Sequence, residues 1–206
     1  MFLLDNPQEL LFRIPALLLA ITFHEYAHAR MAYAWGDSTA KNAGRLTLNP
    51  ISHLDPLGTL MLLIVRFGWA KPVPINPANF RDQRKGLFWV SLAGPGMNLL
   101  LGLVATFLLM NFQGLGPYFS ALMYNIIIFN VFLAIFNVVP LPPLDGSKML
   151  VSLLPNPYLR YYYAVEPYAP ILLISLLLFG FLPLILIPIA SIIINIFSFI
   201  VSFLVF

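Results

Sequence analysis

The chain has 206 residues, of which 60% are hydrophobic and only 9% are charged. A soluble domain carries about 25% charged residues, so this composition excludes an ordinary soluble fold and predicts an integral membrane protein. The net charge of +3 does not indicate nucleic-acid binding, because the basic residues lie between apolar runs, as membrane-flanking residues do. The chain contains no cysteine, which excludes thiol catalysis and cysteine metal sites.

Long apolar runs predict the membrane helices, because a spanning helix needs roughly 20 apolar residues. The predicted spans and the half-helix after them are 10–35, 86–111, 118–138 and 147–154. The uncharged tail at 169–206 predicts two further helices, divided at Gly180 and Pro183. We therefore expect an all-α polytopic membrane protein with about five or six membrane helices.

The polar stretch between the first two spans has two special features. Residues 45–48 alternate polar and apolar side chains, which predicts a short strand in a membrane-associated β-hairpin. The apolar run 57–65 is too short to span comfortably and has basic residues on both sides. We expect a re-entrant segment there, with a thin spanning helix as the alternative.

The distribution of basic residues predicts the orientation of the chain. Eight of the eleven Lys and Arg lie between residues 30 and 85. By the positive-inside rule, we expect 36–85 and 147–168 to be cytoplasmic and the connector 113–118 to be external. The amino terminus is then expected outside.

The first predicted span contains the sequence His24-Glu25-Tyr26-Ala27-His28. Residues at i and i+4 lie on one face of a helix, so both imidazoles can reach a single metal ion. Glu25 is one step round the helix and can hold a water beside that ion. Ionisable residues within a membrane span are costly and functional by default, which favours a metal site over a satisfied polar cluster without metal.

A catalytic zinc takes three protein ligands, so a third ligand is needed. The position six residues after the second histidine is Ala34, which excludes the metzincin pattern. Glu166 and His53 lie in predicted loops, whereas Asp145 follows three prolines that interrupt a span. Backbone broken at membrane depth is tolerated only where it is buried in protein or lines a cavity. Asp145 is therefore the favoured third ligand, with His53 as the alternative and a helix-capping role as the alternative for Asp145 itself.

Two motifs together resemble a known family. HEYAH in the first span and NVVPLPPLDG at 137–146 match HExxH and NxxPxPxLDG, the pattern of the site-2 protease family of intramembrane zinc metalloproteases. AGPGMN at 93–98 resembles the GPxxN segment of that family, and the resemblance covers about residues 10–150. It implies a Zn²⁺ site with these residues: His24, His28 and Asp145 as ligands, and Glu25 as the catalytic base.

The resemblance also implies roles for residues around the metal. Asn137 is expected to hold a substrate carbonyl or an oxyanion, with helix capping or an interhelical hydrogen bond as an equal alternative. His53 and Asp55 could approach the site from their loop, although turn and capping roles are favoured for them. The strand at 45–48 resembles the hairpin that offers family substrates an edge.

We expect a compact form of this family, without PDZ or CBS domains. We expect the chain to form a single membrane-embedded metalloprotease domain over 1–206. Its catalytic core is expected at about 10–155, and its tail at 169–206 is expected to take part in gating. The predicted reaction is hydrolysis of peptide bonds within or near transmembrane segments. The expected partners are a transmembrane protein substrate and the bilayer of a prokaryotic plasma membrane, without nucleic acid.

Other functions and structural roles stay open at this point. A membrane metal-ion transporter or a metal-binding membrane protein could also place His and Asp on a broken helix, and a membrane metalloprotease could cut soluble peptides. The glycines at 94, 96 and 102 are expected to permit close helix packing. The aromatic cluster at 158–163 is expected to anchor the chain at the membrane interface.

Overall fold

The computed structural model of the protein describes residues 7–58 and 70–205. The α-helices within these residues are α1 (Pro7–Ala34), α2 (Thr39–Asn42), α4 (Gln83–Asn111), α5 (Pro117–Val138), α6 (Asp145–Leu153), α7 (Asn156–Val165), α8 (Ala169–Leu178) and α9 (Phe181–Val205). The short 3-10 helices are η1 (Pro50–His53), η2 (Pro77–Asn79), η3 (Gln113–Leu115) and η4 (Glu166–Tyr168).

Five helical stretches in the described residues are long and apolar enough to cross a membrane. They are Glu9–Ala34, Gln83–Asn111, Pro117–Val138, Asn156–Leu178 and Phe181–Leu204. The prediction of a helical protein with about five membrane helices is confirmed by the number of these stretches. The fourth stretch begins earlier than the predicted 169, because α7, η4 and α8 follow one another without an intervening loop. The aromatic cluster at 158–163 therefore belongs to a candidate span and not to a loop.

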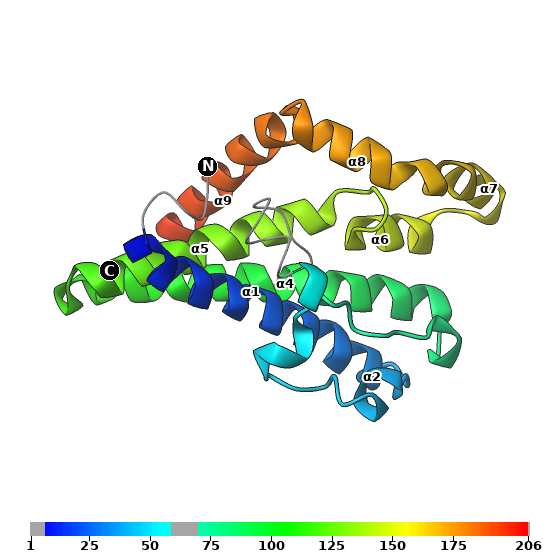
Figure 1. The fold of residues 1–206 in the computed structure, drawn as a ribbon, viewed down its shortest axis with the longest axis horizontal. Coiled ribbons are helices and arrows are strands. Elements are labelled where there is room, and N and C mark those ends of the chain that lie inside the picture. The colour runs from blue at the N-terminus through cyan, green and yellow to red at the C-terminus, as the bar shows by residue number, and fades with distance from the viewer. Residues whose placement is uncertain (1–6, 59–69, 206) are drawn as a thin grey trace.

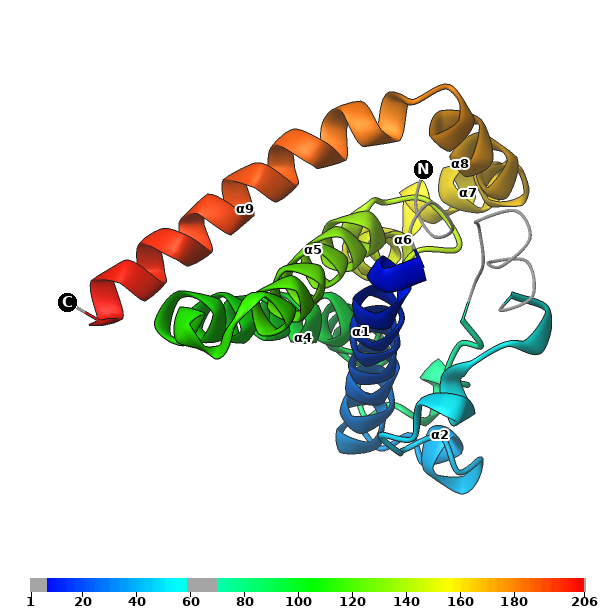
Figure 2. The ribbon, with the colours of Figure 1, turned by 60° about the vertical axis from the view of Figure 1, so that its left-hand side comes forward.

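Helices α1, α4 and α5 pack against one another and form the centre of the molecule (Figure 1). Helix α9 lies on the outer side of this bundle and contacts α5 and α4 (Figure 2). A Cβ atom on Gly102 of α4 would lie 3.1 Å from the ring of Phe197 in α9. This close approach confirms the packing role predicted for Gly102, whereas Gly96 has open space beside it, so the same prediction is wrong there.

The strand predicted at residues 45–48 does not form, and the predicted β-hairpin is wrong for the described residues. Arg45 is instead buried, and its guanidinium donates a hydrogen bond to the carbonyl oxygen of Lys71 at 2.6 Å. The side chain of Asn49 accepts from the backbone N–H of Ile51 and begins η1. Backbone groups of this segment bond elsewhere than to a strand, since the N–H of Arg45 donates to the carbonyl oxygen of Ala40 and the carbonyl oxygen of Thr47 accepts from Nε2 of His53.

Among the described residues near this loop, the pairing that does occur is one antiparallel bridge between Leu54 and Ala70. The backbone N–H of Lys71 donates to the carbonyl oxygen of His53 at 3.0 Å beside this bridge. The predicted re-entrant run 57–65 lies largely outside the described residues, so the structure does not test it.

Asp37 connects the end of α1 to the loop that precedes α4. It is fully buried, and its carboxylate accepts hydrogen bonds from Thr39, from the backbone N–H of Asn76 at 2.7 Å and from the side chain of Asn79 at 2.8 Å. Burial opposes ionisation of Asp37, but these hydrogen bonds hold its pKa below the ordinary value. The loop is thereby fixed beside α1, and it brings Val73 against Glu25.

Candidate metal centre

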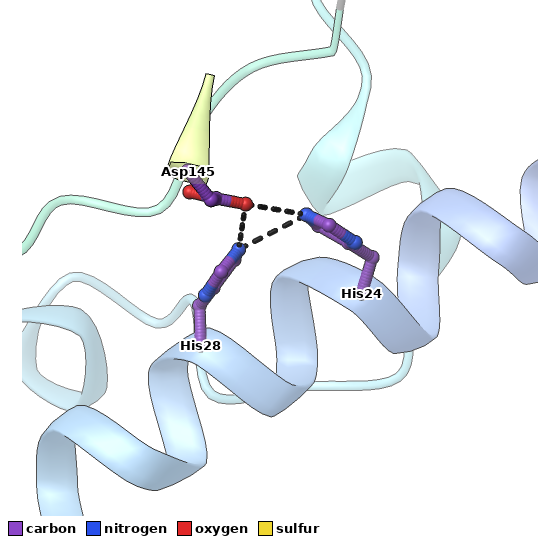
Figure 3. A group of neighbouring side chains, drawn as sticks. All are labelled: His24, His28 and Asp145. Atoms are coloured by element: carbon purple, nitrogen blue, oxygen red, sulfur yellow. Dashed lines mark hydrogen bonds and ion pairs between the residues drawn. The ribbon is translucent and has the colours of Figure 1, made fainter. Parts of the chain in front are cut away.

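Three side chains from two distant parts of the chain converge in the core (Figure 3). His24 and His28 project from α1, and Asp145 reaches them from the first turn of α6. The Nε2 atoms of the two histidines lie 3.0 Å apart, and Oδ2 of Asp145 lies 3.1 Å from the first and 3.0 Å from the second. All three side chains are buried.

The sequence positions these groups through simple local rules. His24 and His28 share one face of α1 because they are four residues apart. Asp145 follows directly on the proline-rich break, and α6 folds back against the end of α5. A Cβ atom on Gly146 would lie only 2.0 Å from the carbonyl oxygen of Val138, so this return of the chain requires glycine.

The hydrogen bonds of the histidines determine which ring nitrogen carries the proton. Nδ1 of His28 lies 2.7 Å from the carbonyl oxygen of Val90, which can only accept, so this nitrogen donates. Nδ1 of His24 likewise faces the side-chain oxygen of Asn98 at 2.5 Å. In a neutral imidazole the other nitrogen is then unprotonated. Both Nε2 atoms therefore direct lone pairs toward each other and toward the carboxylate of Asp145.

Three buried electron-rich atoms in mutual contact repel one another unless a cation lies between them. Ligands at ~2.05 Å from a tetrahedral zinc lie ~3.3 Å from one another, close to the separations of 3.0 and 3.1 Å seen here. Two imidazoles and one carboxylate also form a donor set that zinc accepts. The residues present therefore fit a zinc ion.

Gly94 in α4 makes room for the two imidazoles. A Cβ atom at this position would lie 2.5 Å from Nε2 of His28 and 2.7 Å from Nε2 of His24. The sequence predicted close helix packing for this glycine, and the structure shows that its neighbours are ring atoms of both histidines. A larger residue at position 94 would push against both histidines.

Glu25 lies next to the first ligand in α1 but is not one of the three converging groups. Its side chain is partly buried, and Oε2 accepts a hydrogen bond of 2.8 Å from the backbone N–H of Val73. Val73 is itself buried and packs with Ala29 of α1. The loop before α4 thus holds the carboxylate of Glu25 in a defined orientation.

Comparison with known proteins identifies relatives that are named as zinc metalloproteases. The chain is 42% identical over 157 residues to "Putative zinc metalloprotease YwhC" of Bacillus subtilis, a match that covers 70% of this chain and 69% of that protein. It is 32% identical over 147 residues to "Putative zinc metalloprotease Rip2" of Mycolicibacterium smegmatis, covering 66% of this chain and 55% of that protein. It is also 32% identical over 137 residues to "Putative zinc metalloprotease MJ0611" of Methanocaldococcus jannaschii, covering 62% and 63% of the two chains.

The chain belongs to the site-2 protease family. No protein-family profile and no solved structure matches it. The structure brings together the three residues for which the sequence predicted zinc binding. Asp145 lies inside the first turn of α6, after the N-cap residue Leu144, and its carboxylate faces the histidines. The position of its oxygen atoms agrees with a ligand better than with a helix cap.

The other residues named from the sequence lie in different surroundings. His53 is fully buried, but its Nε2 donates to the carbonyl oxygen of Thr47 at 2.8 Å, and the structure does not bring it to the three ligands. Asp55 accepts from the backbone N–H of Gly58 at 2.7 Å, as a turn residue does. Asn137, in the last turn of α5, donates from its side chain to the carbonyl oxygen of Leu133.

Two residues that contact the histidines of the site were not predicted from the sequence. Val90 supports His28 through its backbone carbonyl, which no side-chain pattern can indicate. Asn98 was recognised only as part of the GPxxN segment, and its contact with His24 was not predicted. Its position four residues after Gly94, on the same face of α4, is the signal that could have found it.

Proposed function

We propose that this chain is an intramembrane zinc protease that hydrolyses peptide bonds within or near the transmembrane segments of membrane-anchored proteins. The observation that supports the proposal is the site itself. His24, His28 and Asp145 converge in the interior of a bundle of apolar helices, and Glu25 is next to them on a helix long enough to cross a membrane. The relatives named as zinc metalloproteases support zinc as the metal.

Each group at the site has a role in peptide hydrolysis. Bound zinc supplies Lewis acidity that polarises the scissile carbonyl. Glu25 takes a proton from the attacking water and delivers it to the leaving nitrogen as the C–N bond breaks. The N–H of Val73 holds the carboxylate in the orientation for both transfers. Asn137, one turn before the proline-rich break, binds a carbonyl of the unwound substrate.

The site is proposed to open toward the cytoplasm of a prokaryotic cell. Eight of the eleven Lys and Arg lie between residues 30 and 85, from the end of α1 to the start of α4, and the positive-inside rule supports a cytoplasmic position for this segment. The chain has no native cysteine, so single cysteines can report the side of the membrane. Gly114→Cys should react with an impermeant maleimide in intact cells and Asn42→Cys should not; the reverse pattern would reject this orientation.

The decisive experiment is Glu25→Gln, assayed with a membrane-tethered reporter. This variant should keep its zinc, because Glu25 is not a ligand, and should lose cleavage by at least about 100-fold, because general acid–base catalysis contributes about 10²–10⁴-fold. Glu166→Gln, in η4, is the matched control and should cleave normally. Undiminished cleavage by Glu25→Gln would disprove the proposed mechanism.

The same preparation distinguishes the alternative functions. Zinc flux through proteoliposomes that depends on His24, together with an intact reporter, would instead indicate a metal transporter. Cleavage of a soluble peptide in preference to the tethered reporter would indicate a membrane metalloprotease that acts outside the bilayer.

A further inference from the structure

A chain of buried amides connects α5 to the metal site. Asn98 and Asn130 are both fully buried, although each lies in the middle of a helix that is long and apolar enough to span a membrane. A buried polar side chain at such a depth is costly unless its hydrogen bonds are satisfied. No motif in the sequence contains Asn130, and the proposed catalytic mechanism does not use it.

The direction of each hydrogen bond in this chain follows from backbone carbonyls, which only accept. The Nδ2 atom of Asn130 donates to the carbonyl oxygen of Ile126 at 2.8 Å, so its Oδ1 faces α4. That oxygen accepts from Nδ2 of Asn98 at 2.7 Å, and the same Nδ2 also donates to the carbonyl oxygen of Ala20 at 3.0 Å. Both amide protons of Asn98 are therefore engaged, and its Oδ1 is the atom that faces His24.

This orientation of Asn98 determines the protonation of His24. With Oδ1 of Asn98 facing it, Nδ1 of His24 carries the proton and Nε2 presents a lone pair to the metal. If the amide of Asn98 turned over, its Nδ2 would face Nδ1 and the proton of the ring would move to Nε2. The ring could then no longer bind a metal ion on the side of Asp145.

Two acceptors oppose this rotation of the Asn98 amide, and they come from different helices. One is the carbonyl oxygen of Ala20 in α1, and the other is Oδ1 of Asn130 in α5. His28 needs no such support, because its Nδ1 donates directly to the carbonyl oxygen of Val90. A change at Asn130 should therefore alter one histidine and leave the other as it is.

We propose that Asn130 is a positioning residue for the metal ligand His24 and acts through Asn98. The proposal rests on the metal site of the proposed function but not on proteolysis. Removal of Asn130 leaves one N–H of Asn98 buried without its acceptor, which is unfavourable because the desolvated N–H is no longer satisfied. Turning the amide over becomes easier, and the fraction of His24 with a free Nε2 lone pair falls.

The test uses the full chain in detergent and measures zinc affinity by competition with a chromophoric chelator. Asn130→Leu keeps the number and branching of the side-chain heavy atoms but has no acceptor, and should weaken zinc binding by about 10–100-fold, as loss of a residue that orients a ligand does. Asn130→Asp should bind within a few-fold of the wild type. Burial favours the neutral acid, which can still donate to Ile126 and accept from Asn98.

Asn125 provides the matched control on the same helix. Its side chain also donates to a carbonyl four residues back, that of Ala121 at 2.8 Å, but it is only partly buried. Asn125→Leu therefore removes the same kind of bond within α5 without touching the amide chain. It should leave zinc affinity unchanged.

A second measurement separates positioning from a general loss of packing. The chain has three histidines, so ¹⁵N labelling of their rings gives a spectrum that single substitutions can assign. In the metal-free wild type, His24 should carry its proton on Nδ1. In Asn130→Leu, a population with the proton on Nε2 should appear at His24 and not at His28.

Different results would reject the role of Asn130 and the proposed function. Wild-type affinity together with an Nδ1-protonated His24 in Asn130→Leu would overturn the role of Asn130. If Asn130→Leu does not fold, the metal-free wild type still decides, because a His24 that carries no proton on Nδ1 there would reject the inference. A wild-type protein that binds no zinc would reject the proposed function, while the tautomer of His24 would still be measurable.

Discussion

Different kinds of contact stabilise two regions of the molecule. One is the metal-site bundle, which consists of α1, α4, α5 and α6, and the other is the tail, which consists of α8 and α9. In the bundle, buried polar side chains from four helices bond to one another around the ligands. In the tail, contacts with the rest of the protein are apolar, and the serines hydrogen-bond to carbonyls of their own helix. Those serines are Ser175, Ser191, Ser198 and Ser202.

This difference determines how each region should respond to substitution. A hydrogen bond or a metal ligand requires one atom at one position, so a small change in the bundle should remove function altogether. Apolar packing between helices tolerates small shifts, so a change in the tail should lower stability gradually. The two regions meet at Leu144, which packs against Leu173, Leu182 and Leu186 directly before the ligand Asp145.

The largest expected effect in the bundle is that of Asp145→Asn. The amide has the shape of the carboxylate and can still occupy the first turn of α6, but it lacks the negative charge that faces the two histidines. Zinc affinity should fall by more than the ~10–100-fold that is typical for a residue that only supports a ligand. Metal analysis of the purified protein measures this effect.

Asp82→Asn is the control for that variant. Asp82 caps α4 by accepting from the backbone N–H of Lys85, so its substitution changes a carboxylate at a helix start that has no metal role. It should leave zinc content unchanged. Full zinc occupancy in Asp145→Asn would show that the carboxylate is not a ligand and would weaken the contrast between the bundle and the tail.

A pair of glycines on α4 sharpens the contrast within the bundle, because one added methyl group meets the converging side chains at one position and open space at the other. Gly94→Ala places a Cβ atom 2.5–2.7 Å from atoms of both imidazoles, so the rings must move. Reporter cleavage should fall by about 100-fold, the loss that a displacement of ~1 Å at a catalytic group can cause. Gly96→Ala meets open space two residues further on and should cleave within about twofold of the wild type.

The sequence predicts the spans and the residues that converge in the core well because both signals are local. Apolar runs of about 20 residues define α4 and α5, and a four-residue spacing places His24 and His28 on one face. The three converging residues could be predicted because the HEYAH and LDG segments each carry their chemistry within a few residues. The beginning of the fourth span is less predictable, since Glu166 and Arg160 interrupt the apolar run that α7 and α8 nevertheless continue.

What the sequence could not predict depends on contacts between distant residues. Alternation over residues 45–48 predicts a strand, but the bond between Arg45 and the carbonyl oxygen of Lys71 draws this segment into a loop. The contact between Val73 and Glu25 and the bond from Asn98 to Asn130 join separate elements. None of these pairs has a characteristic spacing, because their proximity results from packing.

The smallest expected effect is in the tail, where Phe197 is buried against α4 and α5 and Phe199 is 73% exposed on the same helix. Phe197→Ala should lower the free energy of unfolding by about 1–3 kcal/mol. This is less than for a soluble core, because the ring loses packing but gains no contact with water when lipid replaces it. Thermal unfolding in detergent measures the effect, and Phe199→Ala should behave like the wild type. Zinc affinity should be unchanged in both variants, since neither ring contributes to the amide chain or the ligands. If Phe197→Ala lost zinc while its stability held, the tail would be coupled to the metal site through Leu144, and the two regions would have to be treated as one.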